Sequence, residues 1–267
     1  MKILKPIVKE HDGSSLRELI DLWKERSFCE VEEIKTNHYP SNPDAKCWVG
    51  ETGNILLYDF PLLDHLQVEY KMGLFANTIP DGEKNKPWVF WPKHSRMYDK
   101  LKSSLRKSFS ERSTMCGFIG VQTTGHRQKS ADYWSRCCDV FHMYTVPFLV
   151  HEEYLKSISN FRFGLCLPGV GPKCLRDIEL MGLGVVPIFT PQVSTNYHNE
   201  LKKDVHYLVA ETPEDVIHSI NNCSREKWEY ISQECIKWFE KNCSIEGSFN
   251  TTMEIIEKGL YNDRSRL

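Results

Sequence analysis

The stretch from Phe161 to Phe189 constrains the fold more than any other part of the chain. An apolar strand is predicted over Phe161–Leu167, a helix over Cys174–Leu183 and a second strand over Val185–Phe189, with a loop containing two glycines after the first strand. Strands joined through a helix pair in parallel, whereas antiparallel strands need only a tight turn. The window therefore predicts a β-α-β unit of a parallel sheet.

The same alternation extends through the rest of the chain after residue 115. Further elements predicted there are a strand at Met115–Val121, helices at Arg127–Cys138 and Glu152–Ser159, a strand at Tyr207–Val209, and helices that begin at Pro213, Arg225 and Ser248. Strands that alternate with helices form parallel sheets covered on both faces. We therefore predict an α/β fold.

The first hundred residues carry a weaker pattern of the same kind. Helices are predicted at Leu16–Arg26 and around Tyr98–Leu105, and strands at Asn54–Tyr58 and Trp88–Trp91. The serine-rich segment Ser103–Ser113 is the best candidate for a linker. These features predict a second α/β lobe before it.

Composition excludes several classes of protein. The chain has 267 residues, and 34 Lys and Arg against 36 Asp and Glu give a net charge of −2. This length suits one large domain or two small ones, and this charge argues against a broadly basic nucleic-acid binder. No stretch approaches the ~18 apolar residues of a membrane helix, and residues 1–10 do not resemble a secretory signal. The ten cysteines have neither C-x-x-C nor zinc spacing, so we expect reduced thiols and a cytoplasmic protein.

Arg176 and Glu179 give the strongest chemical signal. They lie one helical turn apart, at the start of the helix that follows the glycine loop, beside Lys173. A helix N-terminus and two cations favour phosphate, and a carboxylate can accept hydrogen bonds from two ribose hydroxyls. The pair therefore suggests a nucleotide site, although an Arg–Glu pair on a solvated helix would give the same spacing.

A second strand ends in a similar loop. Phe118–Val121 runs into Gly125, His126 and Arg127, so a cation again follows a strand and a glycine. In an open α/β sheet, ligands bind beyond the carboxyl ends of the strands, where both loops lie. Arg127 could bind the same phosphates, or it could be a surface arginine.

These residues resemble a known signature. Arg176-x-x-Glu179, then Gly184 and Val-Pro-Ile at 186–188, resembles the sugar-nucleotide motif of the exostosin-type enzymes, glycosyltransferase family 47. The chain departs from that motif at Leu180, where alanine is usual, and at Val185, where cysteine is usual. Other matching positions are Phe163, Leu167, Pro168 and Gly169, with Phe118, Gly120 and Arg127 in a second motif.

The resemblance implies a GT-B fold with two Rossmann-like lobes facing a cleft. Residues 1–110 would be a compact N-terminal acceptor lobe, residues 111–247 the nucleotide-sugar lobe, and residues 248–267 a helix returning to the N-terminal lobe. It further implies an inverting glycosyltransferase that moves a sugar from a UDP-sugar, with xylose favoured, to a hydroxyl of an oligosaccharide or glycoprotein. The compact chain resembles exostosin-like enzymes of large DNA viruses such as chloroviruses, which would place it in a host cytoplasm.

The donor site of such an enzyme would draw on both glycine loops. The expected residues are Gly120, His126, Arg127, Pro168, Gly169, Gly171, Lys173, Arg176 and Glu179. The sequence contains no D-x-D motif, so we expect no metal and no other cofactor, with the cations and the helix N-terminus meeting the diphosphate charge instead.

A transfer reaction also needs a base for the acceptor hydroxyl. Asp59 fits best because it follows the predicted strand Asn54–Tyr58, and Asp64 and His65 in the same loop are alternatives. An aspartate before Pro61 can equally form a turn. Trp88 and Trp91 could stack on a sugar or lie in the core.

Two other functions remain open on the sequence. Gly169-Val170-Gly171 begins a dinucleotide fingerprint, but Cys174 stands where its third glycine or alanine belongs, which disfavours an NAD-dependent oxidoreductase. A non-catalytic nucleotide- or sugar-binding module would keep the same fold. A measurement of sugar transfer would distinguish such a binding module from a transferase.

Overall fold

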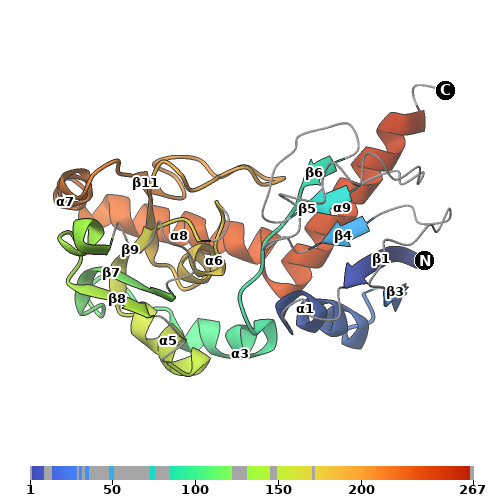
Figure 1. Ribbon diagram of the computed structural model, residues 1–267, viewed down its shortest axis with the longest axis horizontal. Helices are drawn as coiled ribbons and strands as arrows, with labels where there is room; N and C mark the ends of the chain where they lie inside the picture. Colours follow the sequence, from blue (N-terminus) through green and yellow to red (C-terminus); the bar gives the residue numbers. More distant parts are fainter. Residues whose placement is uncertain are drawn as a thin grey trace. The chain divides into compact units, whose positions relative to one another are not determined.

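The chain forms two compact α/β units in the computed structural model (Figure 1). The structure describes residues 2–8, 14–28, 30–31, 34–35, 48–50, 73–75, 85–121, 131–144, 149–169 and 172–264. Unit 1 comprises residues 1–91, 196–199 and 241–267, and unit 2 comprises residues 92–195 and 200–240. These borders differ from those expected at residues 110 and 247.

Unit 1 is built on a parallel sheet. Its strands pair in the order β2-β1-β4-β5-β6, and β3 also pairs with β1. The strands are β1 (Lys2–Val8), β2 (Glu30–Val31), β3 (Ile34–Lys35), β4 (Trp48–Gly50), β5 (Gly73–Phe75) and β6 (Asn85–Pro87). Two helices of this unit, α1 (Ser14–Glu25) and α9 (Ile245–Arg264), pack against each other. The predicted strand Asn54–Tyr58 lies outside the described residues.

Tryptophans tie α9 into the core of unit 1. Trp23 Nε1 donates to the carbonyl of Ile245 at 2.9 Å, and Trp88 Nε1 donates to Thr252 Oγ1 at 2.7 Å. Trp88 and Trp91 are both 0% exposed. They are therefore core residues rather than sugar platforms. The prediction of a strand at 88–91 was also wrong, because the strand β6 ends at Pro87 and the apolar run after it is buried without pairing.

Unit 2 contains a five-stranded parallel sheet in the order β11-β10-β9-β7-β8. Its strands are β7 (Thr114–Val121), β8 (Val140–Tyr144), β9 (Phe161–Cys166), β10 (Val186–Phe189) and β11 (Leu208–Val209). The predicted strands after residue 115 are thus confirmed, and β8 is an additional edge strand that the sequence analysis missed. The prediction of an α/β fold with parallel sheets is confirmed.

Helices connect and cover this sheet. They are α3 (Ser95–Leu105), a short helix at 131–135, α5 (His151–Ile158), α6 (Leu175–Gly182), α7 (Pro213–Asn221) and α8 (Arg225–Asn242). α5 packs against β7 and β9, and α6 packs against β9 and β10. α7 begins at Pro213 as predicted, and Thr212 caps it, since its hydroxyl accepts the N–H of Asp215 at 3.1 Å. Within the described residues, no helix is both long and apolar enough to cross a lipid bilayer.

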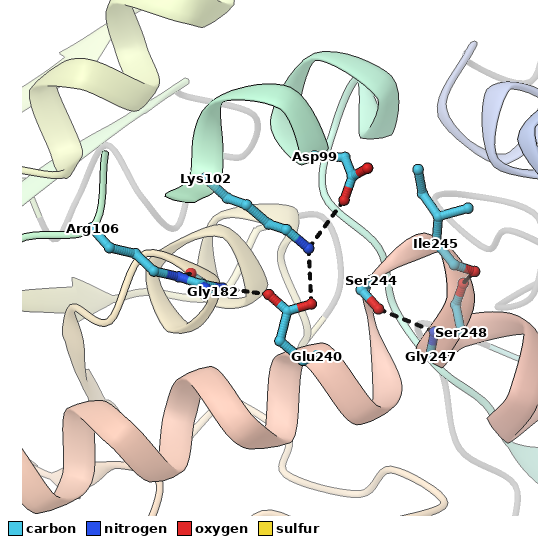
Figure 2. Close-up of polar contacts among 9 residues, drawn as sticks. All are labelled: Asp99, Lys102, Arg106, Gly182, Glu240, Ser244, Ile245, Gly247 and Ser248. Atoms are coloured by element: carbon cyan, nitrogen blue, oxygen red, sulfur yellow. Dashed lines mark hydrogen bonds and ion pairs between the residues drawn. The ribbon is translucent and has the colours of Figure 1, made fainter. Parts of the chain in front are cut away.

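Polar contacts join α3 to α8 inside unit 2 (Figure 2). The Glu240 carboxylate accepts hydrogen bonds from Lys102, at 2.8 Å, and from Arg106. Lys102 also lies 3.0 Å from Asp99, and Arg106 Nε donates to the carbonyl of Gly182 at 2.9 Å. The basic side of α3 is therefore partly buried against neighbouring helices. In unit 1, the N-terminus of α9 is capped by Ser244, whose hydroxyl accepts the N–H of Gly247 at 3.0 Å.

The turn after α6 requires a glycine. Gly184 has φ +69°, the left-handed conformation common just after a helix, and a Cβ there would lie 2.8 Å from Ser232 Oγ. We expect Gly184→Ala to lower the free energy of unfolding by ~1–2 kcal/mol, because alanine is strained in this conformation and crowded by α8. The urea midpoint measures the loss. Asn221→Ala, at an exposed helix end, should leave the midpoint nearly unchanged, and an unchanged Gly184→Ala midpoint would contradict the interpretation.

Candidate functional site

The strand order of unit 2 marks one edge of its sheet as a ligand site. β7 and β9 are neighbours, and from them the sheet continues to β8 on one side and to β10 and β11 on the other. The chain therefore leaves β7 toward one side of the sheet and leaves β9 toward the other, so the strand order reverses between these two strands. In open α/β sheets, ligands bind beyond the carboxyl ends of the strands at such a point.

The side chain of Arg176 occupies this point. It comes from the first turn of α6, and its guanidinium carbon lies 4.3 Å from the centre of the Phe118 ring on β7. Nη2 donates to the carbonyl of Leu167, just past β9, at 2.9 Å. A Cβ on Gly120 would lie 2.7 Å from Nη1, so this glycine leaves room for the guanidinium. Gly120 of β7 and Arg176 of α6 therefore lie against each other, whereas most of the loop that follows β7 lies outside the described residues.

The guanidinium keeps unused hydrogen-bonding capacity. Arg176 is 7% exposed, and its buried Nε has no hydrogen-bond partner among the described residues. Burial disfavours the charge, but the acidic groups around it, including the Cys174 thiol and the Asp177 carboxylate, outweigh this and raise the pKa of Arg176. A buried cation with an unsatisfied donor at a sheet edge can bind an anion.

Glu179 lies one turn further along α6 and is 2% exposed. Its Oε1 accepts the backbone N–H of Lys93 at 3.0 Å and lies 3.4 Å from His151 Nε2 on α5. Tyr154, also on α5, has its pKa raised by burial and by the neighbouring Glu179 carboxylate. The Tyr98 hydroxyl donates to the backbone carbonyl of Glu179 at 2.7 Å, which fixes this turn of the helix.

The N-terminus of α6 differs from the expectation. The Asp177 carboxylate accepts the N–H of Cys174 at 3.0 Å and so brings a negative charge to the first turn. This carboxylate opposes the attraction between the helix dipole and a phosphate. Among the described residues, Arg176 is the cation at the carboxyl ends of β7 and β9, whereas Lys173 is 2% exposed and lies within the fold.

The other expected site residues divide into two groups. Pro168 and Gly169 are partly exposed and follow β9 directly. The remaining members lie outside the described residues: His126, Arg127, Gly171, Asp59, Asp64 and His65. Among the described residues, no group of three or more His, Cys, Asp and Glu side chains could hold a metal ion.

Sequence reasoning missed the surroundings of Glu179. Lys93 contacts Glu179 through its backbone N–H, which any residue type could supply. His151 and Tyr154 belong to the preceding helix α5, so no sequence spacing predicts that they lie near Glu179. His94, beside Lys93, has φ 52°, which is uncommon for a residue other than glycine. Such backbone conformations cluster near functional sites, but they are not visible in a sequence.

Leu180 explains one departure from the exostosin-type motif. A Cβ on Gly164 of β9 would lie 2.5 Å from Leu180 Cδ1, so the leucine packs directly over a glycine. The larger side chain at 180 is accommodated by the missing side chain at 164. Leu180 therefore packs α6 closely on β9.

Comparisons with known proteins add evidence on the fold. No family model matches the chain, and no curated protein matches its sequence. An α1,3-fucosyltransferase solved with GDP is similar at a TM-score of 0.53 and 13% identity, over 95% of this chain and 90% of that one. The fold is of the GT-B type.

Two further structures share less with this GT-B chain. The C-terminal domain of a glycosyl transferase group 1 family protein (LpcC) from Francisella tularensis matches at a TM-score of 0.36 and 11% identity, over 58% of this chain and 95% of that domain. The N-terminal domain of trehalose-6-phosphate phosphatase from Candida albicans matches at 0.34 and 10% identity, over 92% and 46%. The fold assignment rests on the fucosyltransferase.

Proposed function

We propose that this chain is a glycosyltransferase that moves a sugar from a nucleoside-diphosphate sugar to a glycan hydroxyl. The observation that carries the proposal is the Arg176 guanidinium, which is buried at the carboxyl ends of β7 and β9 and whose Nε has no partner in the part of the chain that the structure describes. In this position it meets the diphosphate and stabilises the charge that develops as the nucleotide leaves. Glu179, one turn along α6, accepts hydrogen bonds from the ribose hydroxyls.

The GT-B fold supports a nucleotide-sugar donor. The similar fucosyltransferase was solved with GDP, whereas the exostosin-type motif at 161–189 favours UDP. We propose a UDP-sugar, with UDP-xylose the favoured donor, and an inverting transfer to an oligosaccharide or glycoprotein. The proposed donor site also includes Gly120, Pro168 and Gly169 from the described residues, and His126, Arg127 and Gly171, which lie outside them.

A thermal-shift panel tests donor binding directly. We expect UDP and one UDP-sugar, each with EDTA, to raise the melting temperature by several degrees, because a ligand at 100 times its Kd adds ~2.7 kcal/mol. The panel includes UDP-xylose, UDP-glucose, UDP-galactose, GDP, GDP-fucose and NAD. EDTA should change neither the shift nor the turnover, because the arginines meet the diphosphate charge without a metal.

Each outcome of the panel has a distinct meaning. Stabilisation by GDP alone would be consistent with a glycosyltransferase but would contradict the proposal that the donor is a UDP-sugar. A strict need for Mn²⁺ or Mg²⁺ would overturn metal independence. Stabilisation by NAD alone, or by no nucleotide, would contradict the proposal, and binding without turnover on any glycan acceptor would leave a non-catalytic binding module.

We propose Asp59 as the base that takes the proton of the acceptor hydroxyl. Asp59→Asn should abolish transfer while leaving the Kd for UDP unchanged, because the amide cannot accept a proton and the donor binds to unit 2. Initial rates and calorimetry measure the two quantities. Asp64→Asn and His65→Gln are the comparison variants, and near-normal transfer by Asp59→Asn would move the assignment to one of them.

A further inference from the structure

The Glu179 carboxylate is held by groups from two separate parts of unit 2. Oε1 accepts the Lys93 N–H at 3.0 Å, from the segment before α3, and lies 3.4 Å from His151 Nε2, on α5. Both groups lie against the same carboxylate oxygen. The Lys93 N–H holds this oxygen by a hydrogen bond, and His151 Nε2 lies close to it without a regular hydrogen bond, so a small shift of the ring would hold it from a second direction and orient Oε2.

His151 is itself fixed in place. Its ring stacks on Tyr154 at 5.4 Å between centroids and meets the edge of His94 at 5.1 Å. The buried Nε2 atom makes no regular hydrogen bond, and the only acidic group that the structure places against it is Glu179 Oε1 among the described residues. A buried donor without a regular partner costs stability and calls for an explanation, which a role beside Glu179 supplies.

We propose that His151 is a positioning residue: its Nε2–H holds Glu179 Oε1, so that Oε2 receives the ribose hydroxyls of the nucleotide. This inference rests on the proposed nucleotide site. His151 touches no reacting atom and contributes by pre-organising the carboxylate, which lowers the cost of ordering it when the nucleotide binds. Selectivity for ribose over deoxyribose is therefore the property that His151 controls.

The experiment compares Kd values for UDP and 2′-deoxy-UDP, with GDP and 2′-deoxy-GDP in parallel, by calorimetry. The protein should bind the ribonucleotide at least tenfold more tightly, as expected for a hydrogen bond to a charged group. His151→Phe keeps the ring between Tyr154 and His94 but removes the donor. It should bring the ratio of the two Kd values close to one, while the Kd for 2′-deoxy-UDP stays within about twofold of the parent value.

Two further variants make the result specific. His151→Gln restores an N–H donor and should recover most of the selectivity, which a purely structural role for the ring would not produce. His218→Phe, at an exposed position on α7, is the matched control and should change neither Kd. Glu179→Gln should lose the selectivity as fully as His151→Phe.

The outcomes separate this inference from the proposed function. If no nucleotide binds the parent protein, the nucleotide site itself is wrong. If UDP or GDP binds with ribose selectivity and His151→Phe retains that selectivity, the nucleotide site stands and the role of His151 is overturned. Equal loss of affinity for both nucleotides in His151→Phe would also overturn it, because the ring would then matter only for packing.

Discussion

Replacing Arg176 with methionine is expected to lower the turnover of sugar transfer by ~10²–10³ and to weaken UDP binding by ~10–100-fold. The methionine fills similar space over Phe118 but removes the cation from the carboxyl ends of β7 and β9. Loss of a charge-assisted hydrogen bond to phosphate affects binding, and loss of charge stabilisation of the leaving diphosphate affects turnover. Calorimetry with UDP and initial rates with the donor found by the panel measure the two effects.

Arg162 provides a closely matched control. Its guanidinium carbon lies 4.3 Å from the Phe109 ring, and its Nε donates to the carbonyl of Phe109 at 3.1 Å. It therefore has the same kind of packing as Arg176 but sits near the start of β9, at the opposite end of the strand. Arg162→Met should lose packing without losing nucleotide affinity. Equal effects in the two variants would show that Arg176 supports only the fold.

The parallel sheet of unit 2 could be predicted because its inner strands β7, β9 and β10 are mostly apolar and mostly buried. The edge strand β8 pairs with β7 and is partly exposed along its length, and His142 in the middle of its five residues interrupts the apolar run. Periodicity cannot identify such a strand.

Two segments were misjudged because composition does not report tertiary contacts. The apolar residues at 88–91 are buried in unit 1 as irregular chain, although they resemble a strand. The serines of Ser103–Ser113 suggested a linker, but this segment includes the end of α3 and a fully buried arginine, Arg112. In both cases, distant parts of the chain decide the structure.

The candidate site also has a part that the sequence predicts and a part that only the structure shows. That Arg176 and Glu179 lie one turn apart on a single helix could be predicted from their spacing. Their partners, Lys93 through its backbone and His151 from α5, depend on how α3, α5 and α6 pack. A sequence therefore reveals the residues of one helix turn, and the structure adds those that hold them.

The second large effect is expected at Arg112, which is 1% exposed. Nη1 donates to the carbonyls of Ser159 and Phe161 at 2.8 and 3.0 Å, and Nη2 donates to that of Leu183 at 2.8 Å. Nε donates to the carbonyl of Lys107 at 3.1 Å. Ser159 and Leu183 are the C-terminal caps of α5 and α6, so one side chain satisfies the carbonyl ends of two helices of unit 2.

We expect Arg112→Met to lower the free energy of unfolding by at least ~3 kcal/mol, because it leaves several buried carbonyls without donors. Burial lowers the pKa of Arg112 to about 10, so the guanidinium remains charged at neutral pH. Arg112→Lys keeps the charge but cannot reach all four carbonyls, and should lose less stability than methionine. The exposed Arg225→Met is the control and should barely move the urea midpoint. A methionine variant as stable as this control would show that water replaces the guanidinium, and the helix ends of unit 2 would then be held by the packing of α5 and α6 on the sheet alone.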